Sequence, residues 1–139
     1  MKNLFLCYCV AVFALTLCLS SFAQSPTTQP AVVAAVAPLF PAIARAAHVT
    51  AEVVAEATIK PDGTVTETKI ISGHALLRKQ CEVTAKKWKF SPSTERERKV
   101  RLTFRFAVVN GGKSDPEYTI TFMPPYRVEI AWNPPPPGY

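Results

Sequence analysis

Residues 49–60 alternate strictly between two kinds of position, and this alternation constrains the fold more than any other feature of the chain. A period of two predicts a β-strand with one dry face and one largely wet face. Pro61-Asp62-Gly63 follows as a turn, because proline presets its own φ and glycine accepts a positive φ. The β-branched stretch Thr64–Ile71 then returns as a second strand, so the sequence predicts a hairpin with an apolar face that other elements must cover. The expected dry face consists of Val49, Ala51, Val53, Ala55, Ala57 and Ile59.

Two helical patterns and a third strand can supply that cover. Pro41–Ala47 is typical of a short helix that begins with proline, and Ala75–Lys89 has a single apolar stripe at helical spacing. Pro92 should end this second helix. The apolar stripe is formed by Leu77, Cys81, Ala85 and Trp88, and the expected inward face of the third strand, Val100–Val109, is formed by Val100, Leu102, Phe104, Phe106 and Val108. We therefore expect Trp88 to pack against Phe104 and Cys81 to be a core residue.

The last 29 residues contain two more alternating stretches, Tyr118–Phe122 and Arg127–Trp132, before a proline-rich end. Because strands that follow one another usually pair, we expect the tail to add at least one strand beside Val100–Val109 and to bury Tyr118, Ile120 and Phe122. The predicted fold is α+β: a small antiparallel sheet of three strands, plus one or two from the tail, with two helices packed on one face.

The N-terminus has the pattern of an export signal. Lys2 precedes an uncharged apolar run from Leu4 to Leu19, and Ser21 and Ala23 lie two apart, as a signal peptidase requires. We expect cleavage before Gln24, with residues 1–23 as signal peptide, 24–37 as linker, 38–110 as the domain and 111–139 as tail. The expected location is the periplasm, or the inner membrane if the leader stays uncleaved as an anchor.

No group of residues has the spacing of a catalytic or metal site. His48 and His74 are the only histidines, and neither has a Cys, Asp or Glu at metal-ligand spacing. Cys81 is the only cysteine outside the leader, so the domain cannot contain a disulfide. The sequence therefore predicts a protein that is not an enzyme, with no catalytic residues, no metal and no cofactor.

Basic residues are concentrated in one part of the chain. Between Arg78 and Arg105, ten lysines and arginines stand against three glutamates. A nucleic acid would be the usual partner of such a surface, but the export signal argues against one. A solvated helix face, or contact with an anionic surface of the cell envelope, remains open as an interpretation.

Five short motifs occur in the order and spacing of one known family. They are Leu39–Ala47, Pro61–Val65, Ile71–His74 with Leu76-Leu77, Trp88–Pro92 and Val100–Phe106. Over about Pro38–Val109 the chain resembles the C-terminal domain of TonB-family energy transducers. The resemblance implies binding of an extended segment of an outer-membrane transporter along the last family strand, in support of TonB-dependent transport. The implied binding edge consists of Val100, Arg101, Leu102, Thr103, Phe104 and Arg105.

The chain also departs from the family pattern. Full transducers have a membrane anchor and a long proline-rich spacer, whereas here a leader and a linker of about 15 residues precede the domain. The expected partner is a transporter peptide or another envelope protein, and a homodimer through sheet edges is a further option. Membrane contact is expected only if the leader is uncleaved. The alternative function is a basic envelope protein that reuses the fold to bind an anionic surface, since fold does not decide function.

Overall fold

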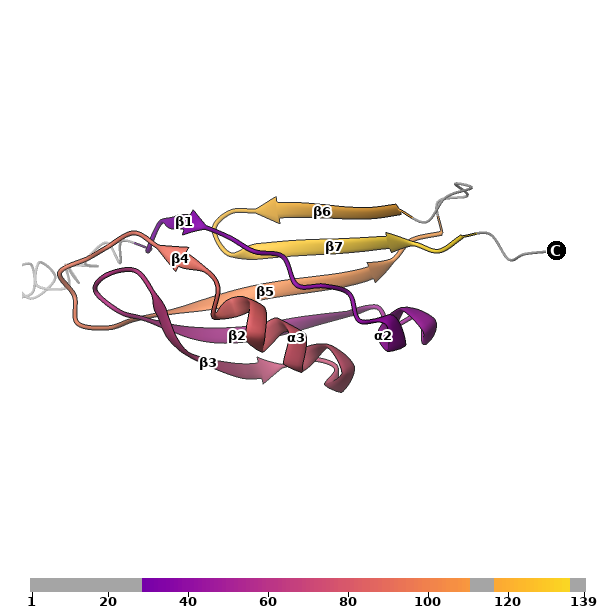
Figure 1. The fold of residues 1–139 in the computed structure, drawn as a ribbon, viewed down its shortest axis with the longest axis horizontal. Coiled ribbons are helices and arrows are strands. Elements are labelled where there is room, and N and C mark those ends of the chain that lie inside the picture. The colour runs from indigo at the N-terminus through magenta and orange to yellow at the C-terminus, as the bar shows by residue number, and fades with distance from the viewer. Residues whose placement is uncertain (1–28, 111–116, 136–139) are drawn as a thin grey trace, which may run out of the picture.

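The computed structural model describes residues 29–110 and 117–135 (Figure 1). Strands and helices follow one another along almost the whole of these two stretches. In chain order they are β1 (Val32–Ala34), α2 (Ala42–Ala46), β2 (Ala51–Ile59), β3 (Val65–Ser72), α3 (Ala75–Ala85), β4 (Lys89–Phe90), β5 (Arg98–Val108), β6 (Glu117–Met123) and β7 (Arg127–Asn133). The predicted α+β class is therefore confirmed.

Five strands form the main sheet in the order β3-β2-β5-β7-β6. The pairs β2–β3, β2–β5 and β6–β7 are antiparallel, but β5 and β7 run parallel, so the sheet is mixed and the expectation of a wholly antiparallel sheet is wrong. The reason is visible in Figure 1: β6 lies at the outer edge, and the chain turns back through β7, which lies between β6 and β5. β5 and β6, which follow one another in the sequence, do not pair because β7 lies between them.

The alternation in the first two strands gives the predicted hairpin. Val53, Ala55, Ala57 and Ile59 of β2 are all completely buried. In the turn, the backbone N–H of Thr64 donates to Oδ1 of Asp62 at 2.9 Å. Gly63 has a φ of +89°, and a Cβ there would collide with the carbonyl oxygen of Phe90. This position therefore requires glycine both for its conformation and for the close approach of a neighbouring strand.

Helix α3 covers the dry face of β2 and β3. It begins after His74, whose Nδ1 accepts a hydrogen bond from the backbone N–H of Leu76 at 3.3 Å. Leu77, Cys81 and Ala85 are completely buried, as the stripe predicts. The helix ends at Ala85 rather than at Lys89, because the chain there extends to form β4.

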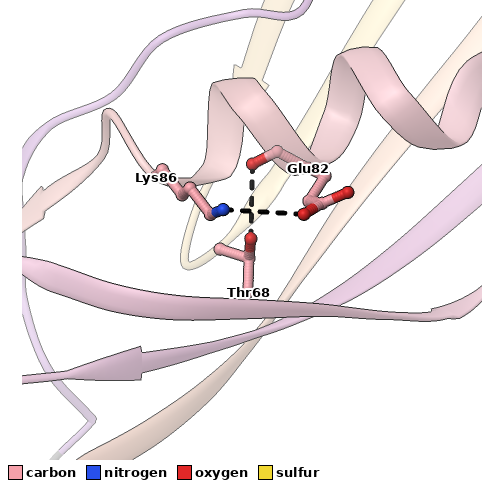
Figure 2. Close-up of polar contacts among 3 residues, drawn as sticks. All are labelled: Thr68, Glu82 and Lys86. Atoms are coloured by element: carbon pink, nitrogen blue, oxygen red, sulfur yellow. Dashed lines mark hydrogen bonds and ion pairs between the residues drawn. The ribbon is translucent and has the colours of Figure 1, made fainter.

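The C-terminal part of α3 is also joined to edge strand β3 by polar contacts (Figure 2). The hydroxyl of Thr68 in β3 donates to the backbone carbonyl of Glu82 at 3.4 Å. The carboxylate of Glu82 forms an ion pair with Nζ of Lys86 at 3.5 Å, one helical turn further on. Both Thr68 and Glu82 are half-buried, so the helix shields this edge of the sheet on its inner side.

Trp88 lies where the sequence predicts, in the core beside Phe104. Its ring is 2% exposed, and the two ring centroids are 6.1 Å apart in an edge-on arrangement. Its indole N–H donates to the carbonyl of Val36 at 2.8 Å. This hydrogen bond ties the N-terminal segment to the core.

Part of the N-terminal stretch interpreted as linker is folded onto the domain. Val32–Ala34 forms strand β1, which pairs antiparallel with β4, and Ser91 donates its N–H to the carbonyl of Ala31 at 2.8 Å. The hydroxyl of Tyr126 donates to the carbonyl of Pro30 at 2.7 Å. Alternation and turn residues in the sequence give no sign of β1, because three residues are too few to establish a period.

Residues 1–23, for which the sequence predicts a signal peptide, and residues 136–139 of the proline-rich end lie outside the described residues. Within residues 29–110 and 117–135, no helix has the length and apolar character needed to span a membrane.

Candidate partner-binding edge

Strand β5 positions the residues that the sequence singles out as a binding edge. Leu102, Phe104 and Phe106 point into the core and are completely buried, whereas Arg101 and Arg105 are exposed on the other face. The predicted inward face is thus confirmed through Phe106. One long edge of β5 is taken up by β2 along residues 98–106. Only the opposite edge could accept another strand.

The tail covers about half of that second edge. β7 runs parallel to β5 from the pair Thr103–Arg127 to the pair Val108–Trp132, which confirms that the tail adds a strand here. The N–H of Thr103 donates to the carbonyl of Tyr126 at 2.9 Å, and the N–H of Val109 donates to that of Trp132 at 2.9 Å. Of the six expected edge residues, Thr103, Phe104 and Arg105 therefore lie beside β7. Val100, Arg101 and Leu102 precede the stretch paired with β7.

Side chains of β7 belong to the same core as the rest of the sheet. Val128 and Ile130 are at most 1% exposed, and Trp132 packs edge-on against Phe40 at a centroid distance of 6.4 Å. On the other face, Nη2 of Arg127 pairs with Oε2 of Glu52 at 3.1 Å. β7 is therefore an integral strand and not a loosely attached extension.

β6 differs sharply from β7. Tyr118, Ile120 and Phe122 lie opposite Trp132, Ile130 and Val128, so they point to the same, inner side of the sheet. They nevertheless remain 43%, 50% and 48% exposed, because α3 does not extend over β6 and α2 reaches it with the side chain of Arg45, whose guanidinium carbon lies 5.4 Å from the centre of the Tyr118 ring. The expectation that the tail buries these three residues is wrong. They form an exposed row, which we call the β6 row.

A groove of about 450 Å³ lies at one end of the β6 row, between the N-terminal segment and the turn that joins β6 to β7. Phe122 belongs to both the row and the groove. The groove is lined mainly by apolar side chains, among them Val32, Trp88, Met123 and Tyr126. Sequence patterns do not reveal it, because its two walls come from segments about 90 residues apart.

Titratable groups in the described parts of the chain offer no catalytic arrangement. Burial raises the pKa of the Cys81 thiol to about 12, which keeps it protonated and unreactive at neutral pH. Burial also raises the pKa of Tyr126, an effect that the nearby Arg98 opposes. Two hydrogen bonds from Thr64 lower the pKa of Asp62 in the hairpin turn. Among residues 29–110 and 117–135, no three His, Cys, Asp or Glu side chains form a cluster that could hold a metal ion.

The family model described as "Gram-negative bacterial TonB protein C-terminal" matches residues 36–109, just over half of the chain. This chain belongs to the TonB C-terminal family. The match begins before α2 and ends immediately after β5, so the strands β6 and β7 lie beyond the family region. Within a TonB C-terminal domain, the tail is therefore an addition that occupies the edge of the last family strand.

A solved structure similar to this TonB C-terminal domain is the solution structure of the TonB C-terminal domain from Pseudomonas aeruginosa. It is 17% identical in sequence, with a TM-score of 0.49, and the similarity covers 58% of this chain and 88% of that one. No curated protein matches the chain significantly.

Proposed function

We propose that this TonB C-terminal domain binds an extended segment of an outer-membrane transporter in the periplasm by strand addition, in support of TonB-dependent transport. The observation that carries the proposal is β7 itself, which lies beside β5 as an added parallel strand. It supports the idea that this edge accepts a strand of suitable pattern. Strand addition uses main-chain hydrogen bonds for affinity and alternating side chains for specificity.

The proposed binding edge is Val100–Arg105, and its first half is the starting point for a partner. Val100, Arg101 and Leu102 are not paired with β7, so a partner strand can begin there. To continue along Thr103–Arg105, the partner must displace β7. It must then replace the buried side chains Val128, Ile130 and Trp132 with apolar residues at every second position. The domain is therefore self-capped, and partner binding requires release of β7.

A reversible lock on β7 tests this proposal. Ala107 of β5 and Ala131 of β7 are directly paired, so the double variant Ala107→Cys/Ala131→Cys places two thiols at a distance suited to a disulfide. A synthetic peptide from the periplasm-facing extended segment of a TonB-dependent transporter serves as the ligand. We expect the reduced protein to bind this peptide and the oxidised protein to lose binding by about tenfold or more, because β7 can no longer leave.

The same molecule in its reduced form is the matched control, and each single cysteine variant controls for the substitutions. Equal binding by the oxidised and reduced forms would overturn the assignment to the β5 edge. Absence of binding in both forms would overturn strand addition of this peptide altogether.

Ion pairs weigh against the alternative of a general anionic-surface binder. Lys86, Lys99 and Arg127 are each paired with a glutamate, at 3.5, 3.4 and 3.1 Å. Part of the positive charge expected from the sequence is thus neutralised within the domain.

A further inference from the structure

We propose that the β6 edge is a homodimer interface, in which two copies of this chain pair antiparallel through β6 around a twofold axis at Ile120. This inference does not rest on the proposed peptide binding at β5, because its evidence is the outer edge of β6, on the other side of the tail hairpin. It begins from the β6 row, since an exposed apolar row on an edge strand is unusual in a soluble domain.

Beyond its first residue, β6 lacks the charges, prolines and bulges that normally prevent edge pairing. The stretch Tyr118–Met123 contains no charged residue and no proline. Its register with β7 is regular over seven pairs, without a bulge. α3 does not lie over it, and α2 reaches it through Arg45, which lies against the ring of Tyr118. The outer backbone N–H and C=O groups of every second residue are therefore presented to any strand that approaches.

The pattern of β6 is complementary to itself in one antiparallel register. With Ile120 opposite Ile120 of the second copy, Tyr118 lies opposite Phe122, and Thr119 lies opposite Thr121. Aromatic residues then meet aromatic residues on the inner face, and hydroxyls meet hydroxyls on the outer face, both of which are favourable cross-strand pairs. None of the residues paired in this way, Tyr118–Phe122, is charged, so no like charges face each other.

Pairing through β6 also explains why assembly would stop at two copies. At the other edge of the sheet, β3 has Glu67 and Lys69 as exposed residues, and its register with β2 is irregular in two places. A twofold pair consumes both β6 edges and leaves only the two β3 edges free. An isologous contact of this kind closes and does not propagate.

The apolar area that the dimer would bury sets its expected affinity. A fully buried aromatic side chain removes roughly 150–250 Å² from water, and the three residues of the β6 row are about half exposed. Each copy thus offers on the order of 300 Å² of apolar side-chain surface, so the total lies below the roughly 1,200 Å² of a standard stable interface. The dimer should be reversible, with a dissociation constant on the order of micromolar.

Charged substitutions of Ile120, the residue on the proposed twofold axis, test both the interface and its register. Sedimentation of the full chain across a concentration series should show a monomer–dimer equilibrium. Ile120→Lys and Ile120→Glu should each weaken the dimer by about tenfold or more, because like charges then lie directly opposite each other. An equimolar mixture of the two variants should recover dimers, because Lys now faces Glu. Thr66→Lys on the exposed β3 edge is the matched control and should leave the equilibrium unchanged.

Three outcomes would overturn the proposal. The first is a wild-type chain that stays monomeric up to high micromolar concentration. The second is a dimer that Ile120→Lys does not weaken although the variant melts like the wild type. The third is a pair of weakened variants that do not recover dimers when mixed, since the axis would then lie elsewhere.

Discussion

The two edge strands of the sheet, β3 and β6, are protected very differently. β3 lies under α3, is joined to it through the contact between Thr68 and Glu82, and has exposed charges at Glu67 and Lys69. β6 lies outside the cover of α3, and three of its large apolar side chains are about half exposed. Natural sheets usually guard their edges with charge, bulges or cover. β3 combines all three, whereas β6 has a regular register, has no charge within Tyr118–Met123, and is contacted at its two ends by Arg45, over Tyr118, and by the N-terminal segment, beside Phe122.

The comparison shows that the guarded edge belongs to the family region and the exposed edge belongs to the tail. The region that matches the TonB C-terminal family ends at Val109 and contains the guarded edge β3. The tail then extends the same core by one buried strand, β7, and ends the sheet with an unguarded one. A strand that is only half covered contributes less to folding but leaves a surface for association.

The largest difference in unfolding free energy should appear between substitutions of Trp88, in the helix-covered core, and of Phe122, in the β6 row. Trp88→Ala should lower the free energy of unfolding by about 3–5 kcal/mol, because it removes a buried ring and its hydrogen bond to Val36. Phe122→Ala in the β6 row should cost only about 1 kcal/mol, because half of its surface is already in water. Urea unfolding at low protein concentration measures both. Equal losses would mean that β6 is as well packed as the helix-covered half.

A matched isoleucine pair separates β7 from β6. Ile130 and Ile120 lie directly opposite each other, but Ile130 is 1% exposed and Ile120 is 50% exposed. Ile130→Ala should cost about 2–5 kcal/mol and Ile120→Ala about 1 kcal/mol or less. If Ile130→Ala proved as mild as Ile120→Ala, β7 would be a dispensable addition and the core would end at β5.

The ionisation and labelling of Cys81 show how completely α3 covers the sheet. Burial raises the pKa of the Cys81 thiol from 9.0 to about 12 in the folded state. Between these two pH values the thiol ionises in the unfolded chain but not in the folded protein, which favours unfolding. The contribution of the thiol to stability is therefore fully present below pH 9 and is lost as the pH rises toward 12. Unfolding free energy should therefore fall more steeply over pH 9–12 in the wild type than in Cys81→Ala. The native thiol should also resist labelling at pH 8, whereas a cysteine introduced by Ile120→Cys should label at once. Fast labelling of Cys81 in the native protein would contradict the closed core.

The smallest change in stability is expected for substitutions at Glu67 and Lys69 on the edge strand β3. Glu67→Val with Lys69→Val should alter the unfolding free energy by no more than about 0.5 kcal/mol, because both side chains are exposed. The doubly substituted β3 edge should nevertheless permit assemblies larger than two copies, visible by light scattering. If the variant keeps the wild-type size distribution, the cover by α3 and the irregular register protect β3 without the charges.

Several features of the fold follow from local pattern and could be predicted. The alternation over residues 49–60 and the Pro61-Asp62-Gly63 turn identify the first hairpin, and the stripe that ends at Trp88 identifies the buried side of α3. The tail strands are also recognisable, because Tyr118–Phe122 and Arg127–Trp132 alternate. Local pattern does not predict β1 or the groove beside it, since both depend on contacts between distant segments.

The sequence by itself determined which residues can form strands and helices and which side of each is apolar, because those properties are periodic and local. Only the tertiary structure decided that β7 and not β6 lies beside β5, that the two strands run parallel, and that α3 covers one edge of the sheet but not the other. Tyr118, Ile120 and Phe122 have the same alternating pattern as Val128, Ile130 and Trp132. Their burial differs because it depends on what packs over a strand, and the alternation of a strand does not specify its cover.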